Sequence, residues 1–358
     1  MGQAVSDGHV ARPDEVALLR GMLEIPSLSG QERLLAEYLR AEMGRRGLRA
    51  SVDEAGNAVG EGGEGGPIVV LLGHMDTAPG LVPVRREGDL LYGRGAVDAK
   101  GPLAAFICAT ARLGRGAGLR LVVVGAVEEE SATSRGARYI AARYHPDACV
   151  IGEPSRWDRA TLGYKGRLLV DYRARQDAAH TAGAVPTASE RAVAFWNGVA
   201  TIAAEAGGAR EFERLSPTLR RIRGESDGID DAAGLALSLR LPPDIDTAGL
   251  RARIAALDPG ATVLFSGDEP AYRAPKNTAL VRAFLAGIRS QGGAPAFALK
   301  TGTSDMNVVG PVWGCPILAY GPGDSSLDHT PHEHINLAEY GRAIAVLEDA
   351  LRHLAGGV

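Results

Sequence analysis

The chain has 358 residues, of which 45% are hydrophobic and 23% charged, and its formal net charge at neutral pH is -4. This length allows one large domain or two smaller ones, and the acidic balance excludes a broad basic surface for nucleic acid. No apolar run is long enough to cross a membrane, and the N-terminus lacks the apolar segment of a signal peptide. The three scattered cysteines form no CxxC pair, which indicates reduced thiols and a cytoplasmic protein.

The first strong pattern is the apolar run at residues 68–72, which predicts a buried parallel strand and leads into Gly73-His74-Met75-Asp76-Thr77. In extended backbone, residues two apart point the same way, so His74 and Asp76 can face one pocket. Open α/β sheets place ligands at the carboxyl ends of their strands, and a carboxylate commonly orients a metal-bound imidazole. A hydrogen-bonded turn is the alternative for the same pair.

Acidic residues follow at three further element ends. Asp98 precedes a helix that begins near residue 101, where it either caps the helix or bridges metal ions. A second apolar strand at residues 121–127 leads into Glu128-Glu129-Glu130, and a third at residues 148–151 leads into Glu153. The three neighbouring negative charges should raise the pKa values of these glutamates. The alternative is that the three glutamates form a solvated acidic loop.

Late histidines complete a possible metal site. A glycine-rich loop before a terminal helix at residues 337–354 carries His329, His332 and His334. Imidazoles and carboxylates from strand ends are the ligands that zinc takes in proteins, and two-metal sites use a bridging carboxylate. A polar stretch further upstream offers candidate substrate contacts or a plain turn; its members are Thr303, Ser304, Asp305 and Asn307, with Lys165 as a further candidate.

The pattern of predicted strands and helices in residues 159–272 differs from that of the flanking sequence. We expect strands at residues 167–175, 234–241 and 262–267 and helices at residues 188–206 and 247–256. This order, close to βαββαβ, predicts an α+β ferredoxin-like domain. It is inserted in a larger α/β domain, residues 1–158 and 273–358, with a mixed central sheet flanked by helices.

These segments together resemble the dinuclear zinc peptidase/deacylase family, which includes acetylornithine deacetylase, succinyl-diaminopimelate desuccinylase and glutamate carboxypeptidase. The likeness covers nearly the whole chain in order; it rests on Gly73-His74-Met75-Asp76-Thr77, Gly93 to Gly101, Glu128-Glu129, Gly152-Glu153-Pro154, Ala179-His180 and the late histidine loop. Many relatives have an aspartate before the paired glutamates, and we place Val127 at that position. The inserted domain is then a lid and dimerisation domain, so the resemblance implies a homodimer.

The resemblance also implies roles for single residues. His74, Asp98 and Glu153 would bind one zinc ion, and Asp98, Glu129 and His329 the other, with cobalt able to substitute. Asp76 would orient His74, Glu128 would act as general base, and His180 would stabilise the oxyanion in the site of the partner protomer. The run of three glutamates leaves the pair Glu129/Glu130 as the alternative register. The Asp98-Ala99 peptide bond is expected to be cis.

Within this family, the chain most resembles a subgroup that releases lysine, or ornithine, from the C-terminal glutamate of a small acidic amino-group carrier protein in lysine and arginine biosynthesis. The alternatives are a deacetylase or desuccinylase of a small N-acyl amino acid, a dipeptidase, and a zinc-binding module without catalysis. An acidic carrier requires a local basic surface. Candidates are Lys165, Arg167, Arg220, Arg221 and Arg223, which could equally be solvated side chains.

Overall fold

The computed structural model describes residues 11–116, 118–180 and 183–356, and the chain folds into two compact units. The larger unit contains the described residues up to Gly163, Ala274–Leu299, and Ser304 onward; the smaller contains Tyr164–Arg273 and Lys300–Thr303. The expected boundary after residue 158 lies five residues earlier, because β8 (Arg159–Tyr164) pairs with a strand of the larger sheet. No described helix is long and apolar enough to cross a membrane.

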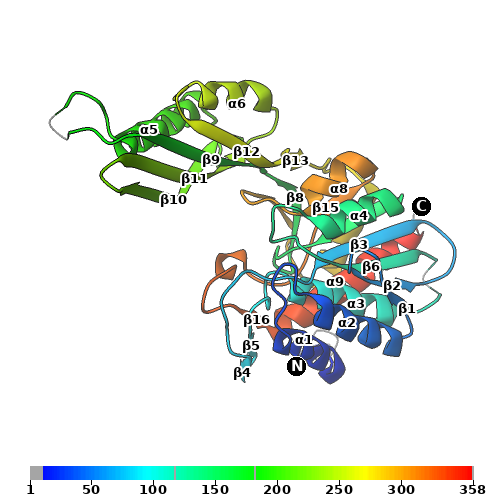
Figure 1. The fold of residues 1–358 in the computed structure, drawn as a ribbon. Helices are drawn as coiled ribbons and strands as arrows, with labels where there is room; N and C mark the ends of the chain where they lie inside the picture. The colour runs from blue at the N-terminus through cyan, green and yellow to red at the C-terminus, as the bar shows by residue number, and fades with distance from the viewer. Residues whose placement is uncertain (1–10, 117, 181–182, 357–358) are drawn as a thin grey trace. The chain divides into compact units, whose positions relative to one another are not determined.

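The larger unit is built on one mixed sheet (Figure 1). Its strand order is β1-β2-β6-β3-β7-β15-β8, and β14 pairs with β8. The bounds are β1 (Arg49–Val52), β2 (Ala58–Gly62), β3 (Ile68–His74), β6 (Arg120–Ala126), β7 (Ala148–Gly152), β15 (Ile317–Ala319) and β14 (Ala296–Lys300). The neighbours β6, β3, β7 and β15 run parallel, whereas β1, β2 and β8 pair antiparallel.

The register of the parallel strands brings their carboxyl ends to one edge of the sheet. His74 pairs with Ala126 and Gly73 pairs with Gly152, so β3, β6 and β7 end within a residue of one another. The apolar runs that predicted these strands are buried on both faces, as strands covered by helices require. The residues that follow the three strands therefore meet at one place.

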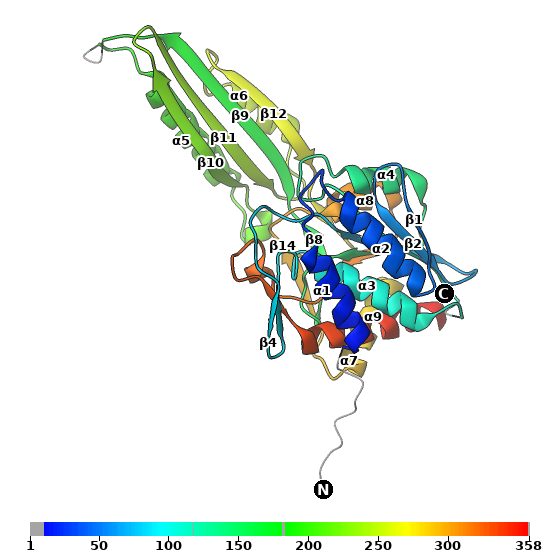
Figure 2. The same cartoon turned by 60° about the horizontal axis from the view of Figure 1, so that its bottom comes forward.

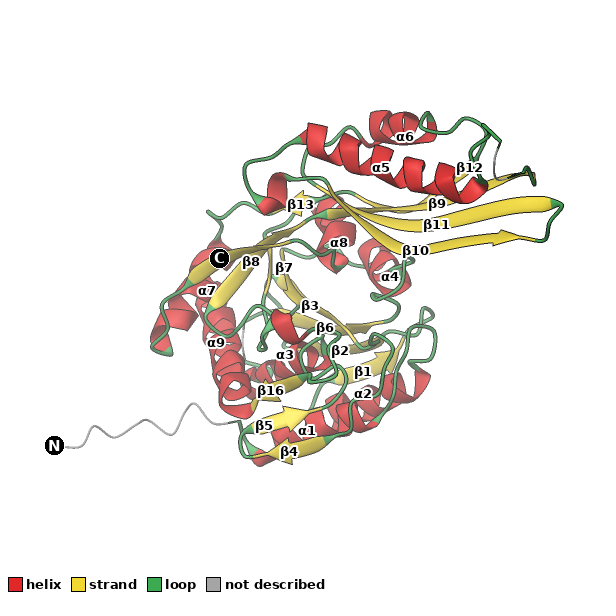
Figure 3. Ribbon diagram, turned by 90° about the vertical axis from the view of Figure 1, so that its left-hand side faces the viewer, coloured by secondary structure: helices red, strands yellow, loops and turns green. Residues whose placement is uncertain are grey.

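Helices cover both faces of this sheet. Helix α3 (Lys100–Leu113) is buried along most of its length and packs beside α9 (Leu337–Gly356), while α4 (Arg135–Arg143) and α8 (Asp305–Trp313) lie on the opposite face (Figures 1 and 3). The other helices are α1 (Pro13–Glu24), α2 (Arg33–Arg45) and α7 (Ala279–Ser290). A small sheet in the order β16-β5-β4 comprises His334–Asn336, Leu90–Tyr92 and Arg85–Glu87. The predicted mixed sheet flanked by helices is confirmed.

The smaller unit is a four-stranded antiparallel sheet with two helices on one face (Figures 2 and 3). Along the chain it comprises β9 (Gly166–Asp177), α5 (Ala188–Ala206), η2 (Glu211–Glu213), β10 (Ser216–Ser226), β11 (Asp230–Leu241), α6 (Thr247–Ala255) and β12 (Thr262–Glu269). The strand order is β10-β11-β9-β12, which confirms the ferredoxin-like pattern. Alternate residues of β9 and β11 face the helices and form a separate core, in which the Tyr172 and Phe195 ring centroids lie 4.3 Å apart.

Strand β10 is absent from the sequence-based assignment, which left residues 207–233 without regular structure. The strand lies at the sheet edge, and its register shifts between Leu219 and Arg221. From Arg220 to Ser226 every side chain is exposed, so the alternation of apolar and polar residues that identifies a strand is lost. The remaining short elements are η3 (Ser325–Leu327) in the late loop and β13 (Tyr272–Arg273) at the end of the smaller unit.

Candidate metal centre

A first group of possible metal ligands forms where β3 and β7 end. The buried imidazole of His74 places Nε2 at 3.2 Å from Asp98 Oδ1 and at 3.9 Å from Glu153 Oε1. Asp98 comes from the loop before α3, and its peptide bond with Ala99 is cis, as expected. These three side chains offer ligand atoms that all lie within 4.8 Å of one another.

A second group shares Asp98 with the first. The His329 Nε2 atom lies 3.0 Å from Asp98 Oδ2 and 2.8 Å from Glu130 Oε1, and the ligand atoms of these three residues also lie within 4.8 Å of one another. The two oxygens of Asp98 thus face two different imidazoles, as a bridging carboxylate requires. The structure places the predicted residues His74, Asp98, Glu153 and His329 together.

The structure favours the alternative glutamate register, Glu129/Glu130, over the preferred pair Glu128/Glu129. Glu128 has a backbone φ of 60°, and its carboxylate accepts hydrogen bonds from Arg135 Nε at 2.8 Å and Thr133 Oγ1 at 2.6 Å. It is therefore held at the start of α4 and belongs to neither ligand group. Glu130, not Glu129, contacts His329.

The left-handed turn at Glu128 explains this difference. The prediction assumed that the first acids beyond the strand lie nearest its end, but β6 ends at Ala126 and the turn reorients the chain. The backbone N–H groups of Glu129 and Glu130 then donate to the two oxygens of Asp76, each at 3.0 Å. The run of three glutamates left both registers open in the sequence; in the structure Glu128, rather than Val127, precedes the pair that is anchored on Asp76.

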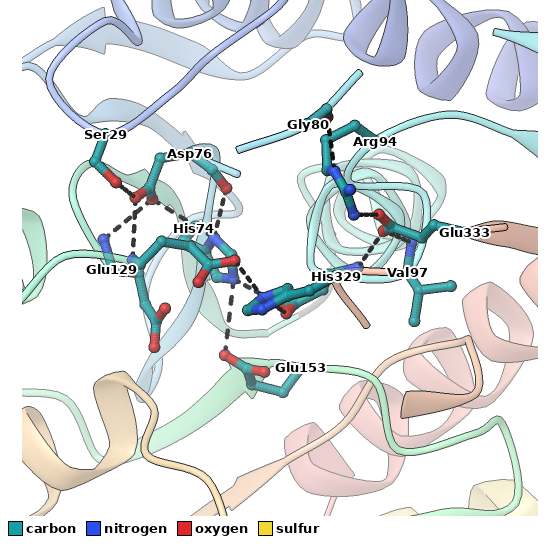
Figure 4. A network of polar contacts seen from close by, with 12 residues as sticks. Ser29, His74, Asp76, Gly80, Arg94, Val97, Glu129, Glu153, His329 and Glu333 are labelled. Atoms are coloured by element: carbon teal, nitrogen blue, oxygen red, sulfur yellow. Dashed lines mark hydrogen bonds and ion pairs between the residues drawn. The ribbon is translucent and has the colours of Figure 1, made fainter. Parts of the chain in front are cut away.

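Asp76 holds several residues of the candidate metal centre in place through hydrogen bonds. It is fully buried, lies 3.5 Å from His74 Nδ1, and accepts the Ser29 hydroxyl at 2.7 Å in addition to the two glutamate amides (Figure 4). Burial disfavours its charge, but the hydrogen bonds from His74 and Ser29 lower its pKa below the ordinary value. Ser29 and Glu32 have the spacing of a helix capping box, but Ser29 binds Asp76 instead, and Glu32 accepts the amide of Glu128 at 3.0 Å.

Glu333 and Arg94 fix the loop that carries Asp98. The buried carboxylate of Glu333 accepts the amides of Val97 at 2.9 Å and Asp98 at 3.1 Å through Oε1, and it pairs with Arg94 Nη1 at 2.8 Å through Oε2 (Figure 4). Arg94 also donates to the Gly80 carbonyl at 3.0 Å. Because Glu333 follows His329 by four residues, one short segment supplies a ligand and holds another.

The electrostatics of the cluster favour bound cations. Burial raises the pKa of Glu129 and Glu153 well above that of a solvated glutamate, and the nearby charge of Asp98 raises it further. Hydrogen bonds to Asp98 and Glu130 raise the pKa of His329 to about 10. Buried carboxylates are normally paired or coordinate metals. The ligand-atom separations near 3 Å also match the edges of a tetrahedral zinc site, roughly 3.3 Å for bonds of 2.0–2.1 Å.

Three of the predicted substrate contacts form hydrogen bonds within the protein. Ser304 and Asn307 cap α8: the Ser304 hydroxyl accepts the Met306 amide at 3.2 Å, and Asn307 Oδ1 accepts the Ser304 amide at 2.9 Å. Thr303 accepts a hydrogen bond from Arg240 at 2.6 Å. Asp305 is buried at the start of α8, where its charge helps to raise the pKa of Glu129, so it lies close to the metal centre.

Besides Thr303, the predicted residues Lys165 and His180 belong to the smaller unit. Lys165 Nζ donates to the Glu211 carbonyl at 3.1 Å and to the Ser216 hydroxyl at 2.8 Å. His180 is exposed in the loop after β9. The twelve residues of β9 span roughly 40 Å, so His180 lies at the opposite end of the strand from Tyr164, where the unit begins.

The sequence of this chain is similar to those of proteins named as hydrolases. Peptidase family M20/M25/M40 matches residues 70–353. A [LysW]-lysine hydrolase of Deinococcus radiodurans is 49% identical over 350 residues, covering 95% of this chain and 97% of the relative. A [LysW]-lysine/[LysW]-ornithine hydrolase of Sulfurisphaera tokodaii is 30% identical over 342 residues, covering 94% of each chain.

Solved structures share the fold. An M20 family metallo-carboxypeptidase of Sulfolobus solfataricus superposes with a TM-score of 0.80 at 19% identity, covering 96% of this chain and all of that one. A dinuclear metal-binding peptidase of the M20 family from Bacillus subtilis gives a TM-score of 0.65 at 14% identity, covering 95% of this chain and 96% of that one. Both cover the larger and the smaller unit, so the insertion is part of the shared architecture.

Proposed function

The chain belongs to peptidase family M20/M25/M40 and is a metal-dependent hydrolase, and we propose that it releases lysine from the carrier protein LysW. The observation that carries this proposal is the 49% identity, over 95% of the chain, with a relative of that name. Ornithine is a second product, because the relative from Sulfurisphaera tokodaii is named for both amino acids. The scissile bond is the amide between lysine and the C-terminal glutamate of the carrier, and the reaction takes place in the cytoplasm.

We propose that two zinc ions bind here. His74, Asp98 and Glu153 hold one ion, and Asp98, Glu130 and His329 hold the other, because each set offers ligand atoms within 4.8 Å of one another. Bound zinc polarises a carbonyl group and makes water acidic enough to supply hydroxide near neutral pH. Cobalt fits the same imidazole and carboxylate ligands.

Glu129 is the general base in this proposal. Its backbone amide is anchored on Asp76, and its side chain is close enough to His74, Asp98 and Asp305 for their charges to influence its pKa. In the reaction, the Glu129 carboxylate accepts a proton from the attacking water and later donates it to the departing α-amino group of lysine. A raised pKa suits both steps, because the group must hold the proton and then release it.

His180 acts on the oxyanion, and we propose that it does so in a second copy of the chain. Its position at the far end of β9 from Tyr164 supports a reach toward another protomer. Mixing Glu129→Gln with His180→Ala tests this arrangement. A heterodimer has one site with Glu129 and His180 both present, so activity should return to a fraction of wild type. Heterodimers that form without any recovery would exclude a shared site.

The substrate is tested with purified protein and three substrate classes. Lysine release from the LysW conjugate should exceed that from acetyl-lysine, acetylornithine or a dipeptide by a large factor in kcat/KM. A higher kcat/KM on an N-acyl amino acid would instead favour a small-molecule deacylase, the second reading of the same site. Metal content, measured on the same preparation, distinguishes an inactive preparation from a wrong substrate.

A further inference from the structure

The open face of the smaller sheet contains a hollow of about 700 Å³. Helices α5 and α6 cover one face of the sheet, and Ala233, Leu235 and Leu237 of β11 pack against these helices. Successive strand residues point to opposite faces, so Ala232, Gly234 and Ala236 of β11 lie on the other face. The hollow therefore has a floor of small residues, and longer side chains of β9 and β10 line its two sides.

The pairing register places these side chains in three rows across the sheet. The middle row is Arg173–Gly234–Arg223; the rows on either side are Asp171–Ala236–Arg221 and Arg175–Ala232–Glu225. Two strand spacings separate β9 from β10, or about 9.6 Å. Each outer row combines a positive and a negative charge, whereas the middle row has two guanidinium groups on opposite sides of a glycine.

The backbone does not require a glycine at position 234. Its pairing with Arg173 and Arg223 is regular, and the register shift of β10 lies elsewhere, between Leu219 and Arg221. A Cβ atom would meet only the Tyr172 carbonyl, at an ordinary 3.5 Å. Glycine in a strand interior weakens the strand and often marks a close approach by a ligand or another chain. Here the glycine leaves the space between the two arginines open.

The two arginines differ in how they are held. Arg173 Nε pairs with Asp171 Oδ1 at 2.6 Å, which orients its side chain along the open face. Arg223 makes no ion pair with any residue that the structure describes. Guanidinium groups bind carboxylates through paired, parallel hydrogen bonds. The middle row thus offers two such groups to a carboxylate that enters above Gly234.

We propose that Arg173 and Arg223 bind a carboxylate on an acidic protein surface, with Gly234 as the point of closest approach. This inference rests on the proposed function, in which that surface belongs to the carrier that presents the lysyl conjugate. Asp171 and Glu225 favour a protein partner over nucleic acid. A nucleic acid has a negative charge at every nucleotide and would meet these two carboxylates in the adjoining rows.

Kinetics with two substrates test the site. In this proposal Arg173 and Arg223 contact only the carrier part of the conjugate, so they contribute uniform binding and affect KM rather than kcat. Arg223→Glu should raise KM for the conjugate on the order of ten-fold, because reversing this charge slows association with an acidic partner and lowers the affinity for it. Hydrolysis of acetyl-lysine should stay within about twofold of wild type. Arg253→Glu, an equal charge change in α6 on the covered side, is the matched control.

A second pair of variants separates space from charge. Gly234→Leu fills the hollow without altering any charge and should raise KM for the conjugate as Arg223→Glu does, while Gly234→Ala should have a smaller effect. The site is refuted if Arg223→Glu and Arg253→Glu give the same KM for the conjugate. A change of oligomeric state in Arg223→Glu would also refute it, because the face would then be an interface between copies of this chain.

Direct binding keeps the site testable if the proposed function fails. A wild-type enzyme that cannot hydrolyse the conjugate would exclude the function, not the anion site. Fluorescein-labelled hexaglutamate should then bind wild type more tightly than Arg223→Glu, and the difference should shrink as salt rises. Equal binding to the two proteins, or tighter Arg223-dependent binding of a hexanucleotide, would refute an acidic protein partner.

Discussion

The metal centre and the arginine rows of the smaller unit both concentrate charge, but they hold it in different ways. At the metal centre, Asp76 receives two backbone amides and a serine hydroxyl, and Glu333 receives two further amides and an arginine. Both carboxylates are fully buried. On the open sheet, Arg223 is exposed and has no ion-pair partner among the described residues.

This difference suits two kinds of recognition. Ligands to metal ions must be held within about half an ångström, which requires supporting hydrogen bonds around each ligand. A protein surface needs less exact placement, and long side chains can adjust to it on contact. Substitutions at the metal centre should therefore abolish metal binding or turnover, whereas substitutions on the open sheet should change the affinity for the carrier conjugate. The following predictions test this contrast, from the largest expected effect to the smallest.

Asp98→Asn should have the largest effect. Asp98 is the one residue common to both ligand groups, so loss of its charge weakens both sites together. We expect metal analysis to find neither site filled after dialysis and activity to fall to background. Circular dichroism provides the control for folding. Two tightly held ions in Asp98→Asn would refute the bridging role.

Glu129→Gln should leave the metals in place and lower kcat by on the order of 10²-fold or more, as removal of a general base commonly does. Glu128→Gln is the matched control, because Glu128 binds Arg135 and Thr133 outside both ligand groups. It should keep most of its turnover. If Glu128→Gln lost turnover and Glu129→Gln lost metal, the register of the sequence-based assignment would be right and the one derived from the structure wrong.

Glu333→Gln should weaken metal binding by about 10- to 100-fold, the usual range for groups that position ligands. The amide keeps the size of the side chain but loses the charge that pairs with Arg94. Glu339→Gln is the control, since Glu339 also accepts two backbone amides, from Trp157 and Gly323, without touching a ligand. Equal losses of metal affinity in the two variants would show that Glu333 acts only through general stability.

Ser304→Ala should have the smallest effect at the catalytic unit. Its hydroxyl caps α8, so we expect a loss of about 1 kcal/mol in the free energy of unfolding and little change in kcat/KM. Denaturant unfolding and steady-state kinetics measure the two quantities. A large fall in kcat/KM with unchanged stability would restore Ser304 as a substrate contact, as the sequence first indicated.

The sequence predicted the parts of the site that depend on strand ends. Apolar runs of four to seven residues located β3, β6 and β7, and the parallel register of these strands brought His74 and Glu153 together. The strand ends themselves needed only local pattern and the rule that ligands bind at carboxyl ends. The choice of Asp98 as a shared ligand, and of His329 among three late histidines, came from the resemblance to the dinuclear zinc peptidase/deacylase family.

Features set by distant contacts could not be predicted in this way. The positive φ at Glu128 depends on hydrogen bonds of its neighbours to Asp76, more than 50 residues earlier in the chain, and it decides which glutamates enter the site. Ser29 has the spacing of a capping box, yet Asp76 is its partner. Strand β10 carries no alternating pattern because its residues from Arg220 to Ser226 are all exposed.

The position of β15 has a consequence for synthesis of the protein. This strand, Ile317–Ala319, lies between β7 and β8, although the chain makes it more than 150 residues after either of them. Until β15 leaves the ribosome, the sheet of the nascent chain lacks the strand that joins β7 to β8. His329 and Glu333 follow β15 in the chain. The ion-binding cluster is therefore completed only after the smaller unit, whose strands and helices are consecutive, has been fully synthesised.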